Sequence, residues 1–341
     1  MFTVFLITVV IFYLFNGFIQ LTLAIQLHKR FKEHSFATSI STVLLWIFAA
    51  LAYPVLLDRA NSAVENVDIH SCFWIVFFTP FAIFFILFYQ FLLLRRKPEL
   101  RLLRKPENLE ARLKSQGNEG KEYDFYVDLK RKVLHLIPAL LIIGLYFLGI
   151  MIKDVSMSYY LIITVGYSGI FAFAMLDLLR FSWLFGTTKY YELLPNKIFE
   201  TLTATMKPKE LVEFIKSAVM ILAMVPILFF DFGIFVSTAL ISTVGDGCAS
   251  VFGITWGTRN WPTTSPKTIV GYIAGAVSSS SLALISLLIF SAYYSAEKII
   301  LLSIISGVLF FMVDFSNSKI DDNILNSIVI GSILGFLSVL V

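Results

Sequence analysis

The sequence is poor in charged residues and in cysteine. Charged residues make up only 15% of the 341 residues and hydrophobic residues 58%, and the mean hydropathy is +0.82. This composition excludes a soluble globular domain and indicates a polytopic membrane protein. The two cysteines, Cys72 and Cys248, cannot define a disulfide framework. No Asn-x-Ser/Thr acceptor is present, so nothing indicates a glycosylated lumenal domain.

The motifs of the common nucleotide-binding folds are also missing. There is no Gly-x4-Gly-Lys-Ser/Thr loop and no protein-kinase motif set, which excludes those two classes. Gly245-x-Gly247-x-x-Ser250 is a partial dinucleotide fingerprint, but it falls in an apolar membrane segment and is discounted. The N-terminal apolar run has no basic segment before it and is too long for a signal peptide, so it is predicted to be the first membrane helix.

Long apolar runs predict an all-α membrane protein with about ten transmembrane helices, because runs of about 20 apolar residues cross a bilayer as helices. The expected spans are 2–27, 36–57, 72–94, 133–152, 158–179, 214–231, 233–255, 269–291, 299–315 and 324–341. Lys and Arg concentrate in 28–34, 95–132 and 180–213. The positive-inside rule therefore places these loops in the cytoplasm and both termini on the other side.

The longest polar stretch, 95–132, contains twelve Lys/Arg against seven Asp/Glu. It is interpreted as a cytoplasmic loop that sets topology and contacts the lipid surface. The interior of this loop mixes charges of both signs and contains no aromatic ladder, which argues against nucleic-acid binding. The chain is therefore divided into a three-span N-terminal extension (1–94), a basic loop (95–124) and a seven-span core (125–341).

One stretch, Val244–Gly275, combines an intramembrane carboxylate with glycines and a basic loop. Asp246 lies in a segment that still reads as membrane, and such carboxylates are costly and usually functional. Closely spaced glycines allow a phosphate to approach the backbone, and Lys267 in the following loop can act as a point charge on phosphate. The alternative is that the glycines are helix-packing contacts, which is the usual role of small residues in membrane bundles.

Three further polar elements stand at the ends of expected spans. Arg131-Lys132-x-x-His135 opens the fourth span, and Asp321-Asp322-Asn323 opens the last. Asp177 and Arg180, three residues apart at the end of the fifth span, are predicted to form an ion pair. Each element has a structural explanation: a topology signal, a helix cap or a charge-neutralising pair. The predicted topology nevertheless places His135, Asp246, Lys267 and the Asp321–Asn323 cluster together at the cytoplasmic face.

The Val244–Gly275 stretch resembles the signature of the membrane-bound polyprenol kinase family, which includes dolichol kinases, phytol kinases and CTP-dependent diacylglycerol kinases. The resemblance rests on Gly245-Asp246-x-x-Ala249, Gly253, Gly257, Pro262 and Lys267-Thr268-x-x-Gly271. The Arg-Lys-x-x-His and Asp-Asp-Asn elements are similar to two further motifs of the family. Val270 stands where the family usually has glutamate, and Ser327 stands where proline is expected.

The resemblance implies a seven-span core with a cytoplasmic active site that transfers phosphate from CTP to a polyprenol of the dolichol type. Asp246, Lys267 and His135 are the candidate catalytic residues. The candidate nucleotide- and phosphate-binding residues are Arg131, Lys132, Gly245, Gly253, Gly257, Arg259, Thr268 and Gly271. The candidate ligands for Mg²⁺ are Asp246, Asp321, Asp322 and Asn323, whose hard oxygens suit that ion. Either Asp246 or His135 is expected to accept the proton of the alcohol.

Several alternatives remain open. The acceptor can be phytol or diacylglycerol instead, and a CDP-lipid synthase has a similar Asp…Gly…Lys-Thr stretch. Those synthases have a further Asp-Arg signature near the C-terminus, whereas 299–341 contains no arginine. A transporter would use Asp246 and Asp177 as midplane ion sites, and a non-catalytic relative is a further alternative. The expected location is the endoplasmic reticulum of a eukaryote or the cell membrane of a prokaryote, and a homodimer is left open.

Overall fold

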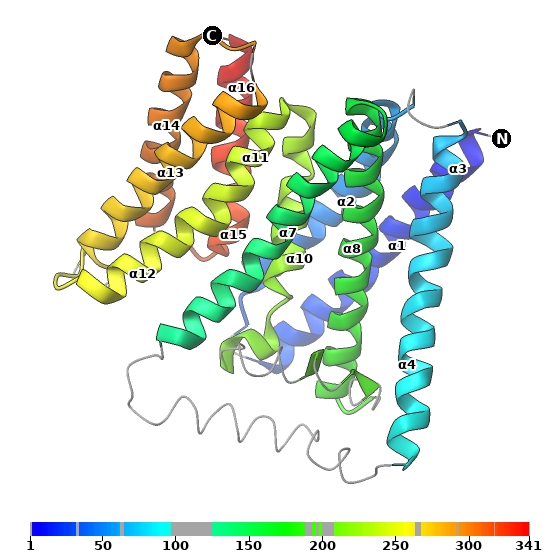
Figure 1. Cartoon of the computed structure of the whole chain (residues 1–341). Coiled ribbons are helices and arrows are strands. Elements are labelled where there is room, and N and C mark those ends of the chain that lie inside the picture. The colour runs from blue at the N-terminus through cyan, green and yellow to red at the C-terminus, as the bar shows by residue number, and fades with distance from the viewer. Residues whose placement is uncertain are drawn as a thin grey trace. The chain divides into compact units, whose positions relative to one another are not determined.

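The computed structural model describes residues 2–31, 34–61, 65–96, 125–187, 193–195, 198–199, 208–262, 267–291, 293–316 and 318–340. These residues form helices and no strands (Figure 1), apart from a single antiparallel bridge between Asn260 and Thr268. The expected all-helical, multi-pass membrane architecture is confirmed. Most of the predicted loop 95–124 lies outside the described residues, so the division of the chain around it stays a prediction.

Nine helices within the described residues are long and apolar enough to cross a membrane. They are Val4–Arg30, Phe36–Asp58, Val67–Arg96, Lys132–Ile152, Val155–Leu184, Phe232–Trp256, Ile269–Phe290, Ala296–Phe315 and Asp322–Leu340. Each matches one of the expected spans, with ends that differ by a few residues.

The expected span at 214–231 is the exception. It forms a shorter apolar helix, Lys216–Phe229, in which α10 (Lys216–Met224) gives way to a 3-10 turn at Pro226–Phe229. Pro226 has no N–H to donate, so one backbone hydrogen bond is missing where the α-helix changes to the 3-10 turn. Fourteen residues of helix extend about 21 Å, which is less than the roughly 30 Å of a bilayer core. The prediction that both termini lie on one side requires this short segment to take the chain across.

The chain divides into two compact units, which are described separately. Unit 1 comprises Met1–Val127 and Leu148–Ala218, and unit 2 comprises Asp128–Phe147 and Val219–Val341. Unit 1 contains α1 (Phe2–Arg30), α2 (Phe36–Asp58), α3 (Val67–Cys72), a π-helical stretch (Phe73–Phe78), α4 (Thr79–Arg96), α8 (Val155–Leu184) and a 3-10 helix (Pro208–Val212). The helix α7 (Phe125–Ile152) and α10 contribute residues to both units.

Buried tyrosines tie the helices of unit 1 together. Tyr13 donates to the backbone carbonyl of Tyr167, Tyr167 donates to the carbonyl of Ala49 at 2.8 Å, and Tyr53 donates to the Ser71 hydroxyl at 2.9 Å. Because a bilayer core offers no water, polar groups at this depth need protein partners. These bonds therefore hold α1, α2, α3 and α8 in one packed group.

The predicted ion pair between Asp177 and Arg180 is confirmed, with 2.6 Å between the Arg180 guanidinium and Asp177 Oδ1. Arg180 also donates to the carbonyls of Glu210, at 3.0 Å, and Glu213. Asp177 accepts the N–H of Ile215 at 3.1 Å. The pair is buried in α8, and its remaining hydrogen-bonding capacity fastens the segment 208–215 to that helix.

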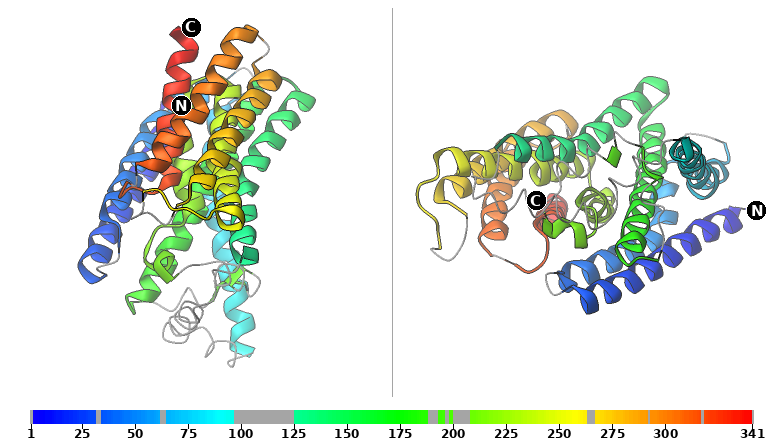
Figure 2. Two further views of the ribbon diagram at one scale, coloured as in Figure 1. Left: turned by 90° about the vertical axis from the view of Figure 1, so that its left-hand side faces the viewer. Right: turned by 90° about the horizontal axis from the view of Figure 1, so that it is seen from below.

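Unit 2 is built around α13. It contains α11 (Phe232–Leu240), a π-helical turn (Ile241–Gly245), α12 (Asp246–Trp256), α13 (Ile269–Phe290), α14 (Ala296–Phe315), α15 (Asp322–Leu325), a second π-helical turn (Asn326–Ile330) and α16 (Gly331–Leu340). The first three elements form one continuous membrane helix. The central helix α13 packs against α11, α12 and α14 (Figures 1 and 2).

Unit 2 has two polar ends. At one end Asp231 caps α11 and accepts hydrogen bonds from Ser291 and Tyr293. At the other end lie the loop that joins α12 to α13 and the connection from α14 to α15 (Figure 1). The second end contains the residues singled out from the sequence.

Candidate functional site

Lys267 stands at the centre of the polar end formed by the α12–α13 loop. Its ammonium group lies 2.5 Å from Asp314 Oδ1 and 3.1 Å from Asp322 Oδ2, and 3.3 Å from the backbone carbonyl of Asp314. The three residues come from the start of α13, the last turn of α14 and the first turn of α15. One cation therefore holds three segments of the chain at this end of unit 2.

Local hydrogen bonds fix the position of Lys267. Its carbonyl accepts the N–H of Trp261 at 3.1 Å, and the N–H of Ile269 donates to the Arg259 carbonyl at 3.1 Å. The next residue, Thr268, is the N-cap of α13, and its hydroxyl accepts the N–H of Gly271 at 3.2 Å. Threonine is a favoured cap because its oxygen satisfies an N–H left free in the first turn. The cap and the paired loop direct the Lys267 side chain towards α14.

The charge on Lys267 is secured by its neighbours. Burial acts to lower the pKa of Lys267, but the carboxylates of Asp322 and Asp314 outweigh that effect and raise the pKa above its ordinary value. Lys267 is therefore a cation at any physiological pH. A raised pKa means that this charge stabilises the folded protein at neutral pH, and that the contribution is lost only in strongly alkaline solution, as the pH rises through the folded-state pKa.

A second ion pair lies beside the first. Lys132 of α7 bonds the carboxylate of Asp246, which opens α12. Both side chains are largely covered, with exposed fractions of 13% and 26%. Asp246 is also near enough to Asp314 and Asp322 to interact with their charges. The site thus combines two lysines with three carboxylates.

Asp314 is the functional candidate that was missed from the sequence. It is almost fully covered, with 7% of its side chain exposed, and lies at the C-terminal end of a membrane helix. A carboxylate is unfavourable there because the helix dipole is also negative at that end. Asp314 is therefore unfavourable both for its charge inside a membrane span and for its position at the helix C-terminus. This could have identified it from the sequence, since an acidic residue inside a membrane span is usually functional.

The predicted carboxylate ligands for Mg²⁺, which are Asp246, Asp321 and Asp322, have different partners in the structure. Asp321 caps α15, where it accepts the N–H of Asn323 at 2.9 Å and the Asn323 side-chain amide at 2.6 Å. The described part of the chain contains no group of three or more His, Cys, Asp or Glu placed to hold a metal ion. Asp321 and Asn323 thus have a local capping role, while Asp322 and Asp246 face the two lysines.

Most of the predicted phosphate-binding glycines are points of close helix packing. A Cβ on Gly257 would lie 2.3 Å from the Thr268 hydroxyl, and one on Gly271 would lie 2.9 Å from the Ala249 carbonyl. A Cβ on Gly245 would lie 2.9 Å from the Ser279 hydroxyl. These contacts bring α12 against α13, as small residues do in membrane bundles. Their predicted contact with phosphate stays a prediction.

Gly253 belongs to the same packed region, since its added Cβ would lie 3.1 Å from the Thr268 hydroxyl. Gly247 differs from this set, because a Cβ added there meets nothing within 4 Å. It directly follows Asp246, so the backbone beside that carboxylate is open to a ligand.

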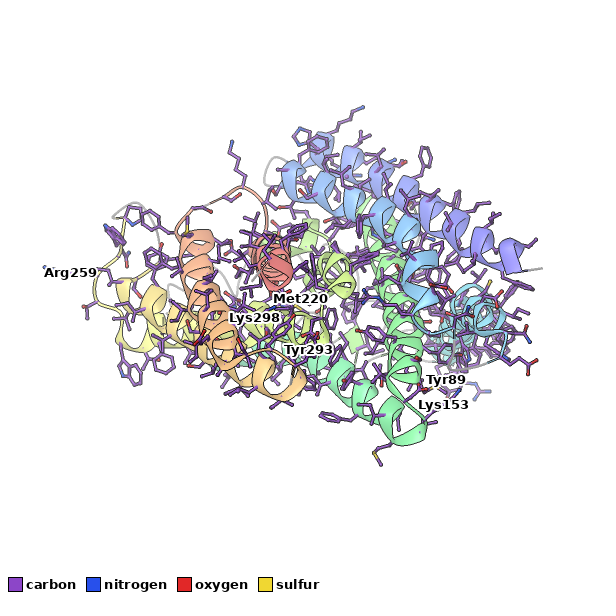
Figure 3. The ribbon with its side chains drawn as sticks, turned by 90° about the horizontal axis from the view of Figure 1, so that it is seen from above. Tyr89, Lys153, Met220, Arg259, Tyr293 and Lys298 are labelled. Atoms are coloured by element: carbon purple, nitrogen blue, oxygen red, sulfur yellow. The ribbon has the colours of Figure 1, made fainter. Side chains whose placement is uncertain are left out.

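Three predicted residues, His135, Arg259 and Arg131, are placed by their elements only. His135 is half-buried on α7 and lies three residues after Lys132, which places both on the same face of the helix. Arg259 is exposed and extends from the α12–α13 loop (Figure 3). The side chain of Arg131 lies outside the described residues.

Comparisons with known proteins add no further identification: no family model, curated protein or solved structure matches the chain.

Proposed function

We propose that the protein is a lipid-alcohol kinase that transfers the terminal phosphoryl group of a nucleoside triphosphate to the hydroxyl of a membrane lipid. The main support is the sharing of Lys267 between two carboxylates at the polar end of the unit 2 helices. A lysine held in that way is charged, positioned and partly exposed. Phosphoryl transfer needs such a group, because catalysis of this reaction is mostly positioning and charge stabilisation.

Lys267 and Lys132 are the groups that would receive the triphosphate. In the structure each lysine is neutralised by carboxylates, which keeps the cations in place before a ligand binds. An incoming phosphate oxygen would compete with these carboxylates for the ammonium groups, and Lys267 would then stabilise charge on the transferring group. The open backbone at Gly247 leaves room for a ligand beside this position.

Asp246 and Asp322 are the groups that would hold Mg²⁺. This ion usually takes only one or two carboxylates from a protein, and substrate phosphates and water complete its shell. A cluster of three protein ligands is therefore not required. When bound, Mg²⁺ neutralises negative charge on the phosphates.

The acceptor hydroxyl attacks phosphorus, its proton passes to a base, and the nucleoside diphosphate leaves. We assign the base to Asp246, whose carboxylate lies among the charged groups, and assign a positioning role to His135. The pH–rate profile of His135→Gln tests the assignment. Loss of the acidic limb near neutrality, together with most of the rate, would make His135 the base instead.

CTP as donor and a dolichol-type polyprenol as acceptor are proposed from the resemblance to the polyprenol kinase family. The purified protein should be incubated with labelled CTP or ATP, Mg²⁺ and separate samples of polyprenol, phytol and diacylglycerol. A lipid monophosphate formed from CTP and polyprenol supports the proposal in full. A CDP-lipid would instead indicate a cytidylyltransferase, and the absence of both products would refute a transferase.

The site is proposed to face the cytosol, because the basic segments 28–34, 95–132 and 180–213 favour that side. In a variant without native cysteines, a membrane-impermeant thiol reagent added outside should label a cysteine at position 61. The same reagent should not label a cysteine at position 264. The opposite pattern would place the site out of reach of cytosolic nucleotide.

A further inference from the structure

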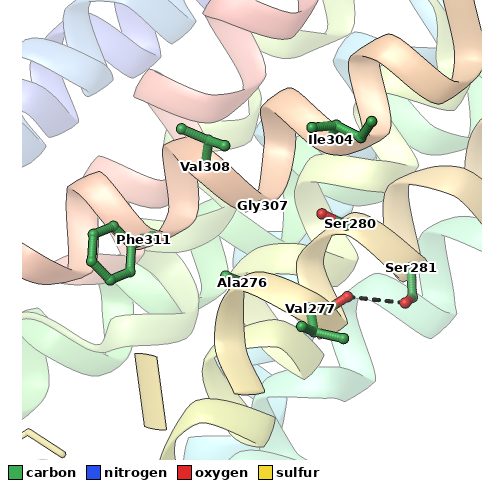
Figure 4. A pocket seen from close by; sticks show the side chains of 8 residues that line it. All are labelled: Ala276, Val277, Ser280, Ser281, Ile304, Gly307, Val308 and Phe311. Atoms are coloured by element: carbon green, nitrogen blue, oxygen red, sulfur yellow. Dashed lines mark hydrogen bonds between the residues drawn. The ribbon is translucent and has the colours of Figure 1, made fainter. Parts of the chain in front are cut away.

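A groove runs along the packed pair α13 and α14 in unit 2 (Figure 4). Its volume is about 440 Å³, which is in the range of small-molecule sites. It is lined by Ala276, Val277, Ser280, Ser281, Ile304, Gly307, Val308 and Phe311. The lining is mainly apolar, and no charged side chain contributes to it.

Small residues form the floor of the groove. A Cβ on Gly307 would lie 2.2 Å from the Ser280 hydroxyl oxygen and 2.6 Å from the Ala276 carbonyl. The two helices therefore approach as closely as glycine allows. The bulkier side chains Val277, Ile304 and Val308 form the edges and are 61%, 57% and 53% exposed. Since α13 and α14 are membrane-spanning helices, this groove opens to the hydrocarbon of the bilayer.

One end of the groove leads to the Lys267 site. Phe311, at that end, stacks on Phe315 with 5.9 Å between ring centroids and 7° between ring planes. Trp261 and Tyr272 pack against the same two rings. Trp261 is 47% exposed, and exposed tryptophan favours the membrane interface, so Trp261 indicates the headgroup level at this end of the groove.

Helix geometry sets the length of this path. Asp314 follows Phe311 by three residues, or about 4.5 Å along the helix axis, and Ile304 lies about 15 Å from Asp314. The groove therefore extends from just below the Lys267 cluster to about half the depth of a bilayer core of roughly 30 Å. An amphiphile with its polar group at Lys267 would place its chain along this groove.

We propose that the groove holds the first part of the hydrocarbon chain of the acceptor lipid, with the hydroxyl at the Lys267 cluster. This inference rests on the proposed function, because the kinase activity is what places the lipid hydroxyl at the Lys267 cluster. The groove offers no hydrophobic gain, because the bilayer is as apolar as its lining. Its contribution is position and orientation: a chain held at a fixed angle presents the hydroxyl to the phosphate.

Two tryptophan substitutions on α14 test this assignment. Val308→Trp fills the groove, whereas Ile300→Trp adds the same bulk one helical turn beyond the far end of the groove at Ile304. Val308 and Ile300 have the same exposed fraction, 53%, so they are matched in lipid exposure. We expect Val308→Trp to lower kcat/KM for a long-chain polyprenol about tenfold, the scale of a modest misplacement of a reacting group. Ile300→Trp should leave it unchanged, and a short-chain alcohol should be affected by neither variant.

A second measurement is independent of turnover. A polyprenol with a photoreactive diazirine in its first isoprene units should label the α13 and α14 peptides in reconstituted vesicles. Labelling should be lost in Val308→Trp and kept in Ile300→Trp. Labelling elsewhere, or equal labelling of both variants, would overturn the assignment.

The two proposals can fail separately. Phosphate transfer without labelling of the groove would reject the groove and leave the kinase proposal standing. Labelling of the groove without phosphate transfer to any alcohol would reject the kinase proposal and leave the groove as a lipid-binding site.

A Val308→Cys variant that lacks Cys72 and Cys248 should stay monomeric under oxidation in lipid-dilute vesicles. An efficient disulfide dimer would show that a second copy of the chain covers the groove.

Discussion

Two charged clusters of this membrane protein differ in how they are built. In unit 1, Asp177 and Arg180 are neighbours on one helix, both about 97% covered, and bonded to the backbone of a nearby segment. In unit 2, Lys267 joins carboxylates from two other elements, and its own side chain is 31% exposed. Both clusters offset the cost of charge at membrane depth.

The difference distinguishes a structural pair from a candidate site. Arg180 donates hydrogen bonds to Asp177 and to two backbone carbonyls. If a ligand replaced these acceptors, the segment 208–215 would lose its attachment to α8. Lys267 has carboxylate partners that a phosphate can replace, and Asp322, one of them, is 41% exposed. Removal of a charge should therefore affect stability in the first cluster and turnover in the second.

The largest effect is expected for Asp246→Ala. If Asp246 binds Mg²⁺ and accepts the proton, its loss should abolish phosphate transfer while the protein still inserts and folds. The variant should be assayed with labelled CTP and polyprenol after size-exclusion chromatography in detergent. Wild-type activity in this variant would remove Asp246 from the mechanism.

Lys267→Met should lower kcat by about 10²–10³, the scale of losing one transition-state charge contact. Lys267→Arg should restore little, since a planar fork replaces a compact charge. The double variant Lys267→Met with Asp314→Asn removes the cation together with its covered carboxylate partner, so that only the 41% exposed Asp322 loses an ion pair. It should recover any lost thermal stability but no activity. Recovery of turnover would show that Lys267 acts only on the fold.

Arg180→Met should lower thermal stability and leave turnover unchanged, which is the opposite of the effect expected for Lys267→Met. Loss of one partner of a buried pair typically costs about 3–5 kcal/mol, so the thermal midpoint in detergent should fall clearly. The correctly folded fraction should keep its turnover per molecule. Arg96→Met, at an exposed position at the end of α4, is the control and should change neither quantity. A stable Arg180→Met protein with reduced kcat would contradict the structural role.

The smallest effect concerns His34, which also holds the segment 208–215 of unit 1. Its Nδ1 lies 2.8 Å from the Val212 carbonyl, and its Nε2 lies 3.0 Å from the Ser39 hydroxyl. Burial lowers the pKa of His34 against the opposing effect of the Val212 bond. As pH falls below the ordinary histidine value of about 6.5, the unfolded chain binds a proton that the folded chain still excludes.

Stability should therefore be full above about pH 6.5 and should decline as the pH falls through the lower folded-state pKa. His34→Gln should lose this part of the pH dependence, which thermal unfolding between pH 5 and 8 would reveal. An unchanged profile in the variant would assign the effect to another group. Turnover at pH 7 should be the same in both proteins.

Much of the fold was predictable because its signals are local. Each apolar run of sufficient length formed a helix, since the bilayer leaves the backbone no other partners. The expected span at 214–231 is a shorter apolar helix than predicted, because average hydropathy does not register the change from α-helix to 3-10 turn at Pro226. The Asp177–Arg180 pair was also predictable, because residues three apart on a helix are neighbours whatever the tertiary structure is.

The candidate site was only partly predictable. Sequence alone indicated Asp246 and Lys267. A carboxylate inside a membrane span costs free energy in any fold and is usually functional, and a lysine in the loop that follows can bind phosphate. It did not indicate that Lys267 pairs with Asp314, that Lys132 pairs with Asp246, or that Gly257 packs against Thr268 and Gly271 against the Ala249 carbonyl. Those contacts join residues up to 114 positions apart.

The amino-acid sequence thus determined that this is a helical membrane protein and which short stretches have charge at membrane depth. Each of these two properties depends on the free energy of transferring a single segment from water into the bilayer, and the amino-acid composition of the segment determines that free energy. The tertiary structure decided which charges meet and where a lipid-facing groove opens beside them. Both depend on which helix ends lie together, and that follows from the packing of small residues such as Gly307 on α14 against α13.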